Sequence, residues 1–176
     1  MEFSGTARLT AQRLTLEHRP EYFRLLQDPA VMATMSPDGR PLSAELATEW
    51  LGYSVAHWEK HGFGYWILKL KESGEFVGRG GLRTTTIDGT DDVELAYAIL
   101  PEFWNRGLTT EFAKGALAAA FKQLHVPHVL CYTLASNRAS QRVMEKCGFR
   151  YEKEVEHANQ PHVFYRITAA EFATIR

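Results

Sequence analysis

The sequence has few cysteines, no excess of either charge and no long apolar run. Its 176 residues include 2 cysteines, Cys131 and Cys147, and carry a formal net charge of −1. Two thiols without Cys-x-x-Cys spacing or a Cys/His cluster predict neither a disulfide framework nor a zinc site. The 7 histidines also lack metal-ligand spacing, so we expect no metal. The near-zero charge argues against a duplex nucleic-acid binder, which usually has a basic excess.

No segment approaches the roughly 18 apolar residues that a transmembrane helix requires. The N-terminal residues lack the basic-then-apolar run of a signal peptide. We therefore expect a cytoplasmic protein with no nucleic acid or membrane partner, either a monomer or a homodimer. Hydrophobic residues make up 45% of the chain, which is ordinary for a globular protein. A chain of this length can bury a sizeable core, and we expect residues 1–176 to form one domain.

Hydrophobic periodicity alternates between the two-residue spacing of strands and the three- to four-residue spacing of helices. It predicts strands at residues 7–17, 63–70, 76–84, 94–100, 129–134, 149–155 and 163–167. It predicts helices at residues 20–28, 43–61, 108–124 and 139–146, with a final turn from residue 168. The polar stretch 86–92 is predicted to be a loop. This order is typical of an α/β (α+β) fold with one mixed, mostly antiparallel sheet.

The stretch from residue 94 to residue 124 combines a strand, a tight turn and a helix. In residues 94–99 large apolar residues alternate with small or acidic ones, which indicates a strand with two distinct faces. Pro101 ends this strand because it has no backbone N–H to donate. After Gly107 the apolar spacing becomes that of a helix. The first amides of a helix have no internal partner and point into the preceding turn. The stretch therefore predicts an anion site, suited to a phosphorylated cofactor.

Five segments resemble the GNAT superfamily of acetyl-CoA-dependent N-acetyltransferases. More narrowly, they resemble its RimJ/RimL-like branch, best known for acetylating protein N-termini. The segments are DPAVM (28–32), GRGGL (78–82), ELAYAILP (94–101), FWNRG (103–107) and NRASQRVMEKCGF (137–149). They extend over nearly the whole chain in the right order. The resemblance implies helices on both faces of a twisted sheet, a central strand pair that splays apart, and acetyl-CoA as co-substrate, without a metal.

By this resemblance the pyrophosphate lies on the amides of residues 104–109, and the pantetheine arm pairs with the end of the preceding strand. The implied cofactor-binding residues are Ile99, Leu100, Trp104, Asn105, Arg106, Gly107, Leu108, Thr109, Thr110 and Asn137. The family pattern for this run is Arg/Gln-x-x-Gly-x-Gly/Ala. This chain departs from it with Trp at the first place, Asn in place of a frequent Gly at the second and Thr at the sixth. These departures affect the expected affinity for acetyl-CoA rather than the expected position of its site.

The reaction needs a neutral amine, yet amines are mostly protonated near pH 7. A carboxylate that removes the proton, directly or through water, is the usual solution. Glu94 is the first candidate, because it matches a base position in many relatives and shares a strand face with Ala96 and Ala98. The alternative for Glu94 is an ordinary ion-paired or solvent-facing glutamate. Glu156 is the second candidate, and His157 is a weaker third.

The departing thiolate needs a proton in return. Many superfamily members carry a tyrosine seven residues after the position of Asn137, but this chain has Met144 there. Ser140 matches the serine proposed for this role in RimL-like enzymes, and water is the alternative donor. Ser140 and Asn137 are also typical of a helix start, where such side chains bond the backbone.

The sequence therefore predicts an acyltransferase of the EC 2.3.1 class that acetylates a primary amine by direct transfer in a ternary complex. The acceptor is expected to be a small molecule or a peptide N-terminus. The weak acidity of the segments expected to bind it (31–40, 59–65 and 159–162) disfavours a polyamine or an aminoglycoside. The alternative is a non-catalytic acyl-CoA-binding or regulatory module with the same fold. A dinucleotide binder is disfavoured, because the Gly-x-Gly-x-x-Gly turn is missing.

Overall fold

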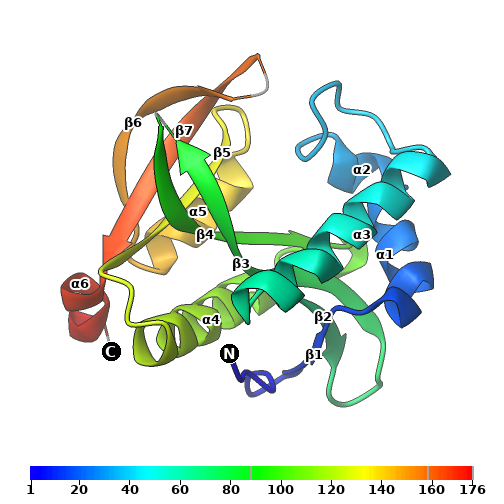
Figure 1. Ribbon diagram of the computed structural model, residues 1–176, viewed down its shortest axis with the longest axis horizontal. Coiled ribbons are helices and arrows are strands. Elements are labelled where there is room, and N and C mark those ends of the chain that lie inside the picture. Colours follow the sequence, from blue (N-terminus) through cyan, green and yellow to red (C-terminus); the bar gives the residue numbers. More distant parts are fainter. Residues whose placement is uncertain (88, 158, 176) are drawn as a thin grey trace.

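A seven-stranded open sheet forms the centre of the molecule (Figure 1). The computed structural model describes residues 1–87, 89–157 and 159–175. The strands lie in the order β1-β2-β3-β4-β5-β7-β6. Their bounds are β1 Leu9–Arg13, β2 Tyr65–Leu70, β3 Phe76–Ile87, β4 Thr90–Ile99, β5 His128–Leu134, β6 Arg150–His157 and β7 Gln160–Thr168. The α-helices are α1 Arg19–Leu26, α2 Pro29–Met32, α3 Ala44–His61, α4 Leu108–Gln123, α5 Arg138–Lys146 and α6 Ala169–Thr174, with short 3-10 helices η1 Leu16–His18 and η2 Pro101–Phe103.

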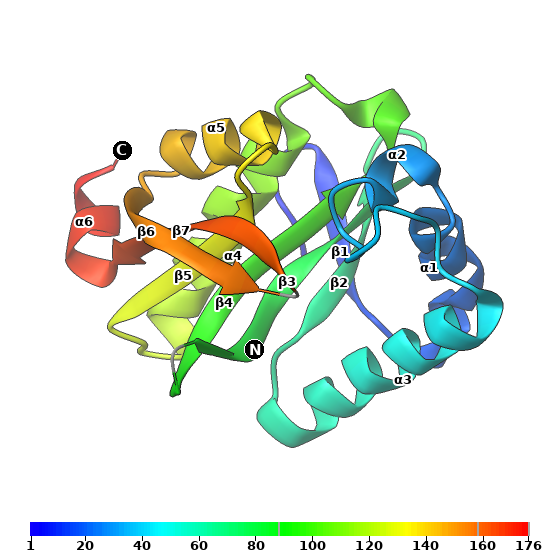
Figure 2. The same cartoon turned by 90° about the horizontal axis from the view of Figure 1, so that it is seen from above.

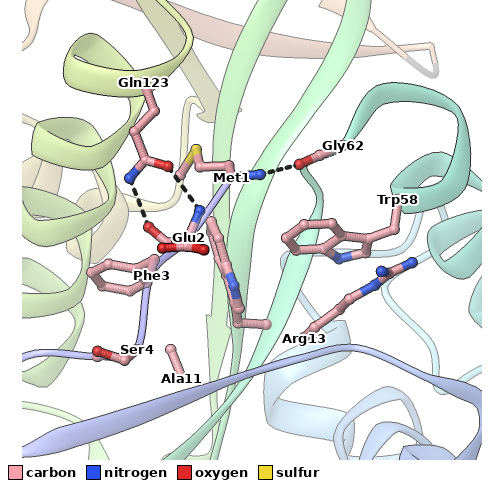
Figure 3. A pocket seen from close by; sticks show the side chains of 11 residues that line it. Met1, Glu2, Phe3, Ser4, Ala11, Arg13, Trp58, Gly62 and Gln123 are labelled. Atoms are coloured by element: carbon pink, nitrogen blue, oxygen red, sulfur yellow. Dashed lines mark hydrogen bonds between the residues drawn. The ribbon is translucent and has the colours of Figure 1, made fainter.

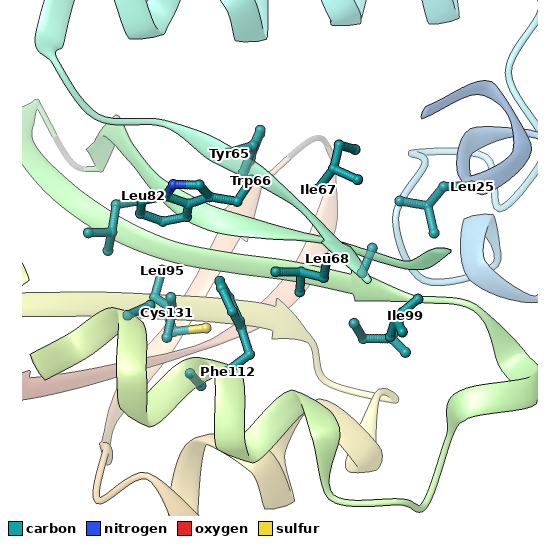
Figure 4. Close-up of a cluster of buried hydrophobic side chains, with 14 of the residues drawn as sticks. Leu25, Tyr65, Trp66, Ile67, Leu68, Leu82, Leu95, Ile99, Phe112 and Cys131 are labelled. Carbon is teal, nitrogen blue, oxygen red and sulfur yellow. The ribbon is translucent and has the colours of Figure 1, made fainter. Parts of the chain in front are cut away.

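The sheet is mixed and mostly antiparallel, as predicted. β4 and β5 run parallel, and the other neighbouring strands pair antiparallel. Helix α3 lies on one face of the sheet and α4 on the other (Figure 4). A second view shows α1 and α2 on the side of α3 (Figure 2), while α5 contacts α4. In the described ranges, none of the helices is long and apolar enough to cross a bilayer.

The core around β2 and β3 depends on close approach between aromatic rings and glycine. Phe112 of α4 packs edge-on against Trp66 of β2, with ring centroids 6.4 Å apart (Figure 4). Gly80 of β3 makes room for this ring, since a Cβ there would lie 2.2 Å from Phe112. Gly81, the next residue, meets the backbone of β2, and a Cβ there would lie 2.2 Å from the carbonyl oxygen of Gly64. The glycines of the 78–82 motif therefore set the spacing between β3 and its neighbours.

The first strand is shorter than predicted. β1 ends at Arg13 instead of continuing to Glu17. Leu14 is fully buried, but Leu16, which the alternation places on the same face, is 63% exposed. The chain turns into η1 here, because the backbone N–H of Thr15 donates to Nδ1 of His18 at 3.2 Å. A local side-chain bond thus outweighs the two-residue alternation.

The predicted loop at residues 86–92 is wrong, because most of it belongs to a long hairpin. β3 continues to Ile87 and pairs there with Thr90, the first residue of β4. Gly89 has φ +76°, and Asp88 lies outside the described residues. An Asp-Gly pair is typical of a tight hairpin turn, so the polar composition reflects an exposed hairpin rather than a loop.

The segment at Asp28 also differs from the prediction. The first helix ends at Leu26, two residues before the predicted stop. Asp28 then begins a new helix, α2, and its side chain accepts hydrogen bonds from the amides of Ala30 and Val31 at 2.9 and 3.0 Å. Proline in the next position fits the first turn of a helix, where its missing N–H is not needed.

The last two strands pair antiparallel as predicted, but they are longer than expected. β6 and β7 form a hairpin from residue 150 to residue 168, so Gln160, Pro161 and His162 of the predicted late loop belong to β7. Ala158 lies outside the described residues. The side chain of Gln160 donates to the carbonyl oxygen of Pro37. The tip of this hairpin therefore contacts the segment that follows α2.

We expect Gly81→Ala to destabilise the protein by about 3 kcal/mol, because its new Cβ meets backbone atoms that cannot rotate away. Gly52→Ala is the matched control. Gly52 lies in α3 with nothing within 4 Å of an added Cβ, and alanine is the better helix former by about 0.5–1 kcal/mol. Urea unfolding measures both changes. A Gly81→Ala protein as stable as the wild type would contradict this account of the sheet spacing.

Candidate functional site

Strands β4 and β5 separate almost as soon as they meet. Within the described residues they pair at one position, Glu94 with Leu130, so the predicted splayed central pair is confirmed. The N–H of Leu100 donates toward β3 at 2.9 Å. In an antiparallel ladder the direction of the backbone groups alternates, so Tyr97 and Ile99 turn their N–H and C=O groups away from β3. These groups face the opening between β4 and β5.

The two residues predicted to pair with a pantetheine arm differ from each other in where their backbone groups point. Ile99 borders the opening, where its carbonyl oxygen accepts a 2.6 Å hydrogen bond from the indole N–H of Trp104. Leu100 uses its N–H on Val77 and its carbonyl on Phe103, at 2.9 and 3.0 Å. β4 therefore presents the backbone of Tyr97 and the N–H of Ile99 to the opening, rather than the backbone of Leu100.

The turn before α4 is held in a left-handed backbone conformation. Asn105 has φ 59° and Gly107 has φ 75°, a region that glycine adopts without strain and asparagine tolerates. Arg8 fixes the turn from the N-terminal segment, since its Nη1 donates to the carbonyl of Arg106 at 3.0 Å. The same arginine is anchored by Glu111 of α4, with Nε 2.6 Å from Oε2. The shape of the turn is thus set by internal contacts.

Helix α4 begins directly after this turn. The amides of Leu108, Thr109 and Thr110 have no partner within the helix, and the positive end of the helix dipole lies at the same place. Leu108 is buried, at 3% exposure, while the threonines are half-buried. Trp104 and Arg106 are exposed at the surface of the turn. The predicted run 104–110 is therefore one connected turn and helix start, with the geometry that suits phosphate oxygens.

The start of α5 lies across the opening from β4. Asn137 caps this helix: its Oδ1 accepts from the amide of Ser140 at 3.1 Å, and its Nδ2 donates to Oγ1 of Thr133 at 3.1 Å. The hydroxyl of Ser140 lies 3.0 Å from the phenol oxygen of Tyr97 on β4. Burial raises the pKa of Tyr97 well above its ordinary value, so the phenol stays protonated near neutral pH and can donate to Ser140.

Glu94 is an ion-paired and buried glutamate, at 4% exposure. Arg83 lies directly opposite it on β3, and Nε of Arg83 is 2.7 Å from Oε2 of Glu94. Nη2 of the same arginine donates to the hydroxyl of Tyr132 on β5 at 2.9 Å. Burial raises the pKa of Tyr132 to about 12, so this hydroxyl keeps its proton. The carboxylate is thus held in one orientation at the position where β4 and β5 part.

Two histidines from the β6–β7 hairpin complete the group. The ring of His157 lies 5.0 Å from that of Tyr132, and His162 lies 5.4 Å from His157. Burial, together with the nearby His162 and Arg83, lowers the pKa of His157, so its imidazole is neutral at pH 7. We call Arg83, Glu94, Tyr132, His157 and His162 the polar cluster.

Glu156 lies outside the polar cluster. It is exposed on β6, opposite Pro161 of β7. Successive side chains of a strand point to opposite faces, so Glu156 points away from the face on which His157 meets Tyr132. Of the three predicted base candidates, the structure brings together Glu94 and His157.

Three residues of the site are missed in the sequence. Tyr97 counts there as an apolar strand residue, although its hydroxyl sets it apart from Leu95 and Ile99. Arg83 meets Glu94 through the hairpin register, which the predicted loop at residues 86–92 did not include. Tyr132 comes from a strand far along the chain, and its spacing gives no signal, whereas His162 lies in the segment 159–162 that was expected to bind the acceptor.

Two cavities lie away from this site. One, of about 840 Å³, is lined by the N-terminal segment together with Trp58, Trp66 and Gln123 (Figure 3). The other, of about 380 Å³, lies at the far ends of β4 and β7 near Asp92 and Arg166. Neither contains the residues of the polar cluster. In the part of the chain that the structure describes, no group of three or more His, Cys, Asp or Glu side chains is placed to hold a metal.

Comparisons with known proteins identify the family. Residues 8–150 match the family described as Acetyltransferase (GNAT) domain. The chain is also 32% identical over 184 residues to an FsC-acetyl coenzyme A-N(2)-transacetylase from Aspergillus fumigatus, a match that covers 95% of this chain and 76% of that protein.

Solved structures agree with this family. A GnaT-family acetyltransferase from Bordetella pertussis, described as putative, has a TM-score of 0.81 at 21% identity over 94% of this chain and 99% of that chain. The ribosomal L7/L12 α-N-protein acetyltransferase RimL, in complex with coenzyme A, has a TM-score of 0.77 at 13% identity over 93% and 95%. Both likenesses show the fold, and the second does not single out the RimJ/RimL-like branch. The chain belongs to the GNAT acetyltransferases and is an N-acetyltransferase with acetyl-CoA as its co-substrate.

Proposed function

We propose that this enzyme transfers the acetyl group of acetyl-CoA directly to the primary amine of a small molecule or of a peptide N-terminus. The observation that carries the proposal is Glu94, a buried and oriented carboxylate at the one described rung where β4 and β5 meet. The relative from Aspergillus fumigatus is named for transfer to an N(2) atom, which supports an amine acceptor. A RimJ/RimL-like preference for peptide N-termini is supported by the five sequence segments.

The residues around the opening fit acetyl-CoA. The amides of residues 108–110 and the left-handed turn at Gly107 suit the pyrophosphate. The outward-facing backbone of Tyr97 and the N–H of Ile99 suit the amides of the pantetheine arm, which would lie between the separated strands. An N–H at this end of β4 can also donate to the thioester oxygen as negative charge develops there.

Glu94 is the proposed general base. It accepts a proton from the acceptor ammonium, directly or through water, and the resulting neutral amine attacks the thioester carbon. Arg83 fixes Oε2 of this carboxylate at 2.7 Å, and Oε1 is the oxygen proposed to accept the proton. The C–N bond then forms, the C–S bond breaks, and the thiolate of CoA leaves.

Ser140 is the proposed proton donor to the departing thiolate. A serine hydroxyl alone is a poor acid, but Ser140 lies 3.0 Å from the protonated phenol of Tyr97. Because burial raises the pKa of Tyr97 well above its ordinary value, the phenol keeps its proton and orients the serine hydroxyl through this contact, and water returns the proton that Ser140 gives up. The tyrosine thus enters from β4 rather than from the position of Met144 on α5.

Replacing the base should lower turnover while leaving the cofactor site intact. We expect Glu94→Gln to reduce kcat by about 10²-fold, with little change in the Kd for acetyl-CoA. Thiol release from acetyl-CoA against a panel of amines and short peptides measures the first quantity, and calorimetry measures the second. Glu72→Gln, the same change on an exposed hairpin turn, is the control. An active Glu94→Gln enzyme together with an inactive Glu156→Gln enzyme would move the base to Glu156.

Distorting the turn should weaken cofactor binding. We expect Gly107→Ala to raise the Kd for acetyl-CoA about 10-fold, because alanine resists φ 75° and the turn must reshape. Gly74→Ala is a matched control, since Gly74 has φ 74° and lies in the β2–β3 turn with open space around it. Both variants carry similar backbone strain, so calorimetry should separate them. An equal increase in the Kd for acetyl-CoA in both variants would show that backbone strain lowers the stability of the protein, and would not implicate the turn at Gly107 in cofactor binding.

The pH profile should report the histidine of the polar cluster. The pKa of His157 is lowered from 6.5, so the imidazole gains a proton only below that pH, adding positive charge next to Arg83. We expect kcat/KM to fall as pH decreases through this range, and His157→Asn to reduce that fall while changing kcat at pH 7.5 by less than about 3-fold. A 10²-fold loss of kcat at pH 7.5 would instead make His157 the base.

A further inference from the structure

The outer edge of β3 loses its strand partner close to the polar cluster. Within the described residues, β2 pairs with β3 no further than Gly81, and the N–H of Leu82 donates to the carbonyl oxygen of Gly64 at 3.3 Å. Backbone directions alternate along an antiparallel ladder, so the next N–H that points the same way belongs to Thr84. Arg83, which orients the proposed base, lies between these two amides. It is therefore placed where β3 changes from an inner strand to an edge strand.

A histidine of α3 takes the place of the missing strand partner. Nε2 of His57 accepts the N–H of Thr84 at 3.0 Å, and the hydroxyl of Thr84 lies 3.2 Å from the same nitrogen. Nδ1 of His57 lies 2.8 Å from the carbonyl oxygen of Phe63, which precedes β2. A ring nitrogen that accepts an N–H carries no proton, so the proton of the neutral ring is on Nδ1 and is donated to Phe63. We call the hydrogen bonds of His57 to Phe63 and Thr84 the histidine bridge.

The histidine bridge exists only while the imidazole is neutral. A protonated ring carries a hydrogen on both nitrogens, so Nε2 would meet the strand amide donor to donor. Burial lowers the pKa of His57 from 6.5, and so does repulsion by His61 and Lys60 of α3 and by Arg83 of β3, while the hydrogen bond to Phe63 acts in the opposite direction. The ring is therefore neutral at pH 7. The bridge is intact there and is lost as pH falls through the lowered pKa.

The histidine bridge acts on the polar cluster through Arg83. Thr84 is the next residue along β3, so a bond to its N–H fixes the backbone from which the side chain of Arg83 leaves the strand. Nε of Arg83 contacts Glu94 at 2.7 Å, and Nη2 contacts Tyr132 at 2.9 Å. A strand segment that loses its outer hydrogen bonds opens locally more easily. A shift of β3 at this point would displace both contacts of the guanidinium together.

We propose that His57 is a positioning residue for acetyl transfer, because it holds β3 at Thr84 and thereby keeps Arg83 and Glu94 in their reactive arrangement. This inference rests on the proposed function and adds to it a residue that touches neither the substrate nor the reacting atoms. The cofactor-binding turn is held instead by contacts from the N-terminal segment. Loss of the histidine bridge should therefore lower kcat and leave the Kd for acetyl-CoA unchanged. The bridge also makes the site sensitive to acid.

Two substitutions separate the hydrogen bonds of the histidine from the packing of its ring. His57→Phe keeps a ring next to Phe63 and His61 but can neither accept nor donate. His57→Gln keeps an amide that can accept from Thr84 and donate to Phe63. We expect His57→Phe to lower kcat at pH 7.5 about 10-fold with the Kd for acetyl-CoA changed by less than about 2-fold. His57→Gln should stay within about 3-fold of the wild-type kcat. An unchanged kcat in His57→Phe, or an equal loss in both variants, would overturn the proposal.

Ser54→Ala is the control for a general loosening of α3. The hydroxyl of Ser54 lies 3.2 Å from the phenol oxygen of Tyr22 on α1, so this change removes a hydrogen bond of the same helix away from β3. Ser54→Ala should lower the Tm by a few degrees, as His57→Phe does, and keep kcat within about 2-fold of the wild type. A loss of kcat as large as that of His57→Phe would assign the effect to the helix as a whole and overturn the proposal.

Nitrogen-15 NMR of the imidazole tests the histidine bridge without turnover. At pH 7.5 the ring of His57 should be neutral with its proton on Nδ1, and a proton on Nε2 would overturn the proposal. As the ring gains its second proton below pH 6.5, the amide of Thr84 should exchange with solvent faster than it does in His57→Gln at the same pH. Over that range the kcat of the wild type should fall relative to the kcat of His57→Gln, and a constant ratio would exclude the acid sensitivity.

The kinetic outcomes separate this inference from the function on which it rests. If thiol release failed with every amine and peptide, the proposed function and the positioning role would fall together, whereas the NMR result would still show whether the histidine bridge forms. If Glu94→Gln lost its turnover and His57→Phe did not, the proposed function would stand and only the positioning role would fall.

Discussion

The separation of β4 from β5 is the constraint on which the rest of the structure depends. Each strand is fixed by its outer neighbour, since β4 pairs with β3 from Gly78 and Ile99 to the hairpin turn, and β5 pairs with β7 along its whole length. The two ladders diverge after the rung at Glu94 and Leu130. Each strand keeps its hydrogen bonds to its outer neighbour where the two diverge. The backbone groups of β4 can therefore face a ligand although the sheet is open at this point.

The chemistry gathers where the strands part. Glu94 lies at that rung, Tyr132 follows on β5, and Arg83 reaches both from β3. An ion pair with one buried partner contributes little to stability, because desolvation of Glu94 offsets its Coulomb energy. Its value is orientation: the carboxylate and the hydroxyl are held by one planar group.

The sequence predicts the fold well where local patterns decide it. The β4 strand, the turn at Gly107, α4 and α5 follow from periodicity and from residues with special backbone preferences. Errors arise where local chemistry competes with periodicity, as at Thr15 and His18, or where polar residues form an exposed hairpin, as at Thr86 and Thr90.

The site is predictable in part for the same reason. The cofactor-binding run follows from a contiguous motif, and Glu94 from its place on β4. Arg83 meets Glu94, and Tyr132 and His162 join the polar cluster, only through the sheet register, which a single sequence does not contain. The residue types can be read from the sequence, but the contacts between residues that are far apart along the chain cannot.

The polar cluster is best understood as one proton acceptor. A proton on Glu94 would neutralise the partner of Arg83, but the side chain of Arg83 is 40% exposed, so water can solvate the cation while the proton is held. A proton on His157 would keep the Arg83–Glu94 pair intact, but it would place a second cation nearby. His157 is also exposed to solvent, unlike Glu94. Within the proposed function, Glu94 is therefore suited to take the proton from the buried amine, and His157 to pass it to water.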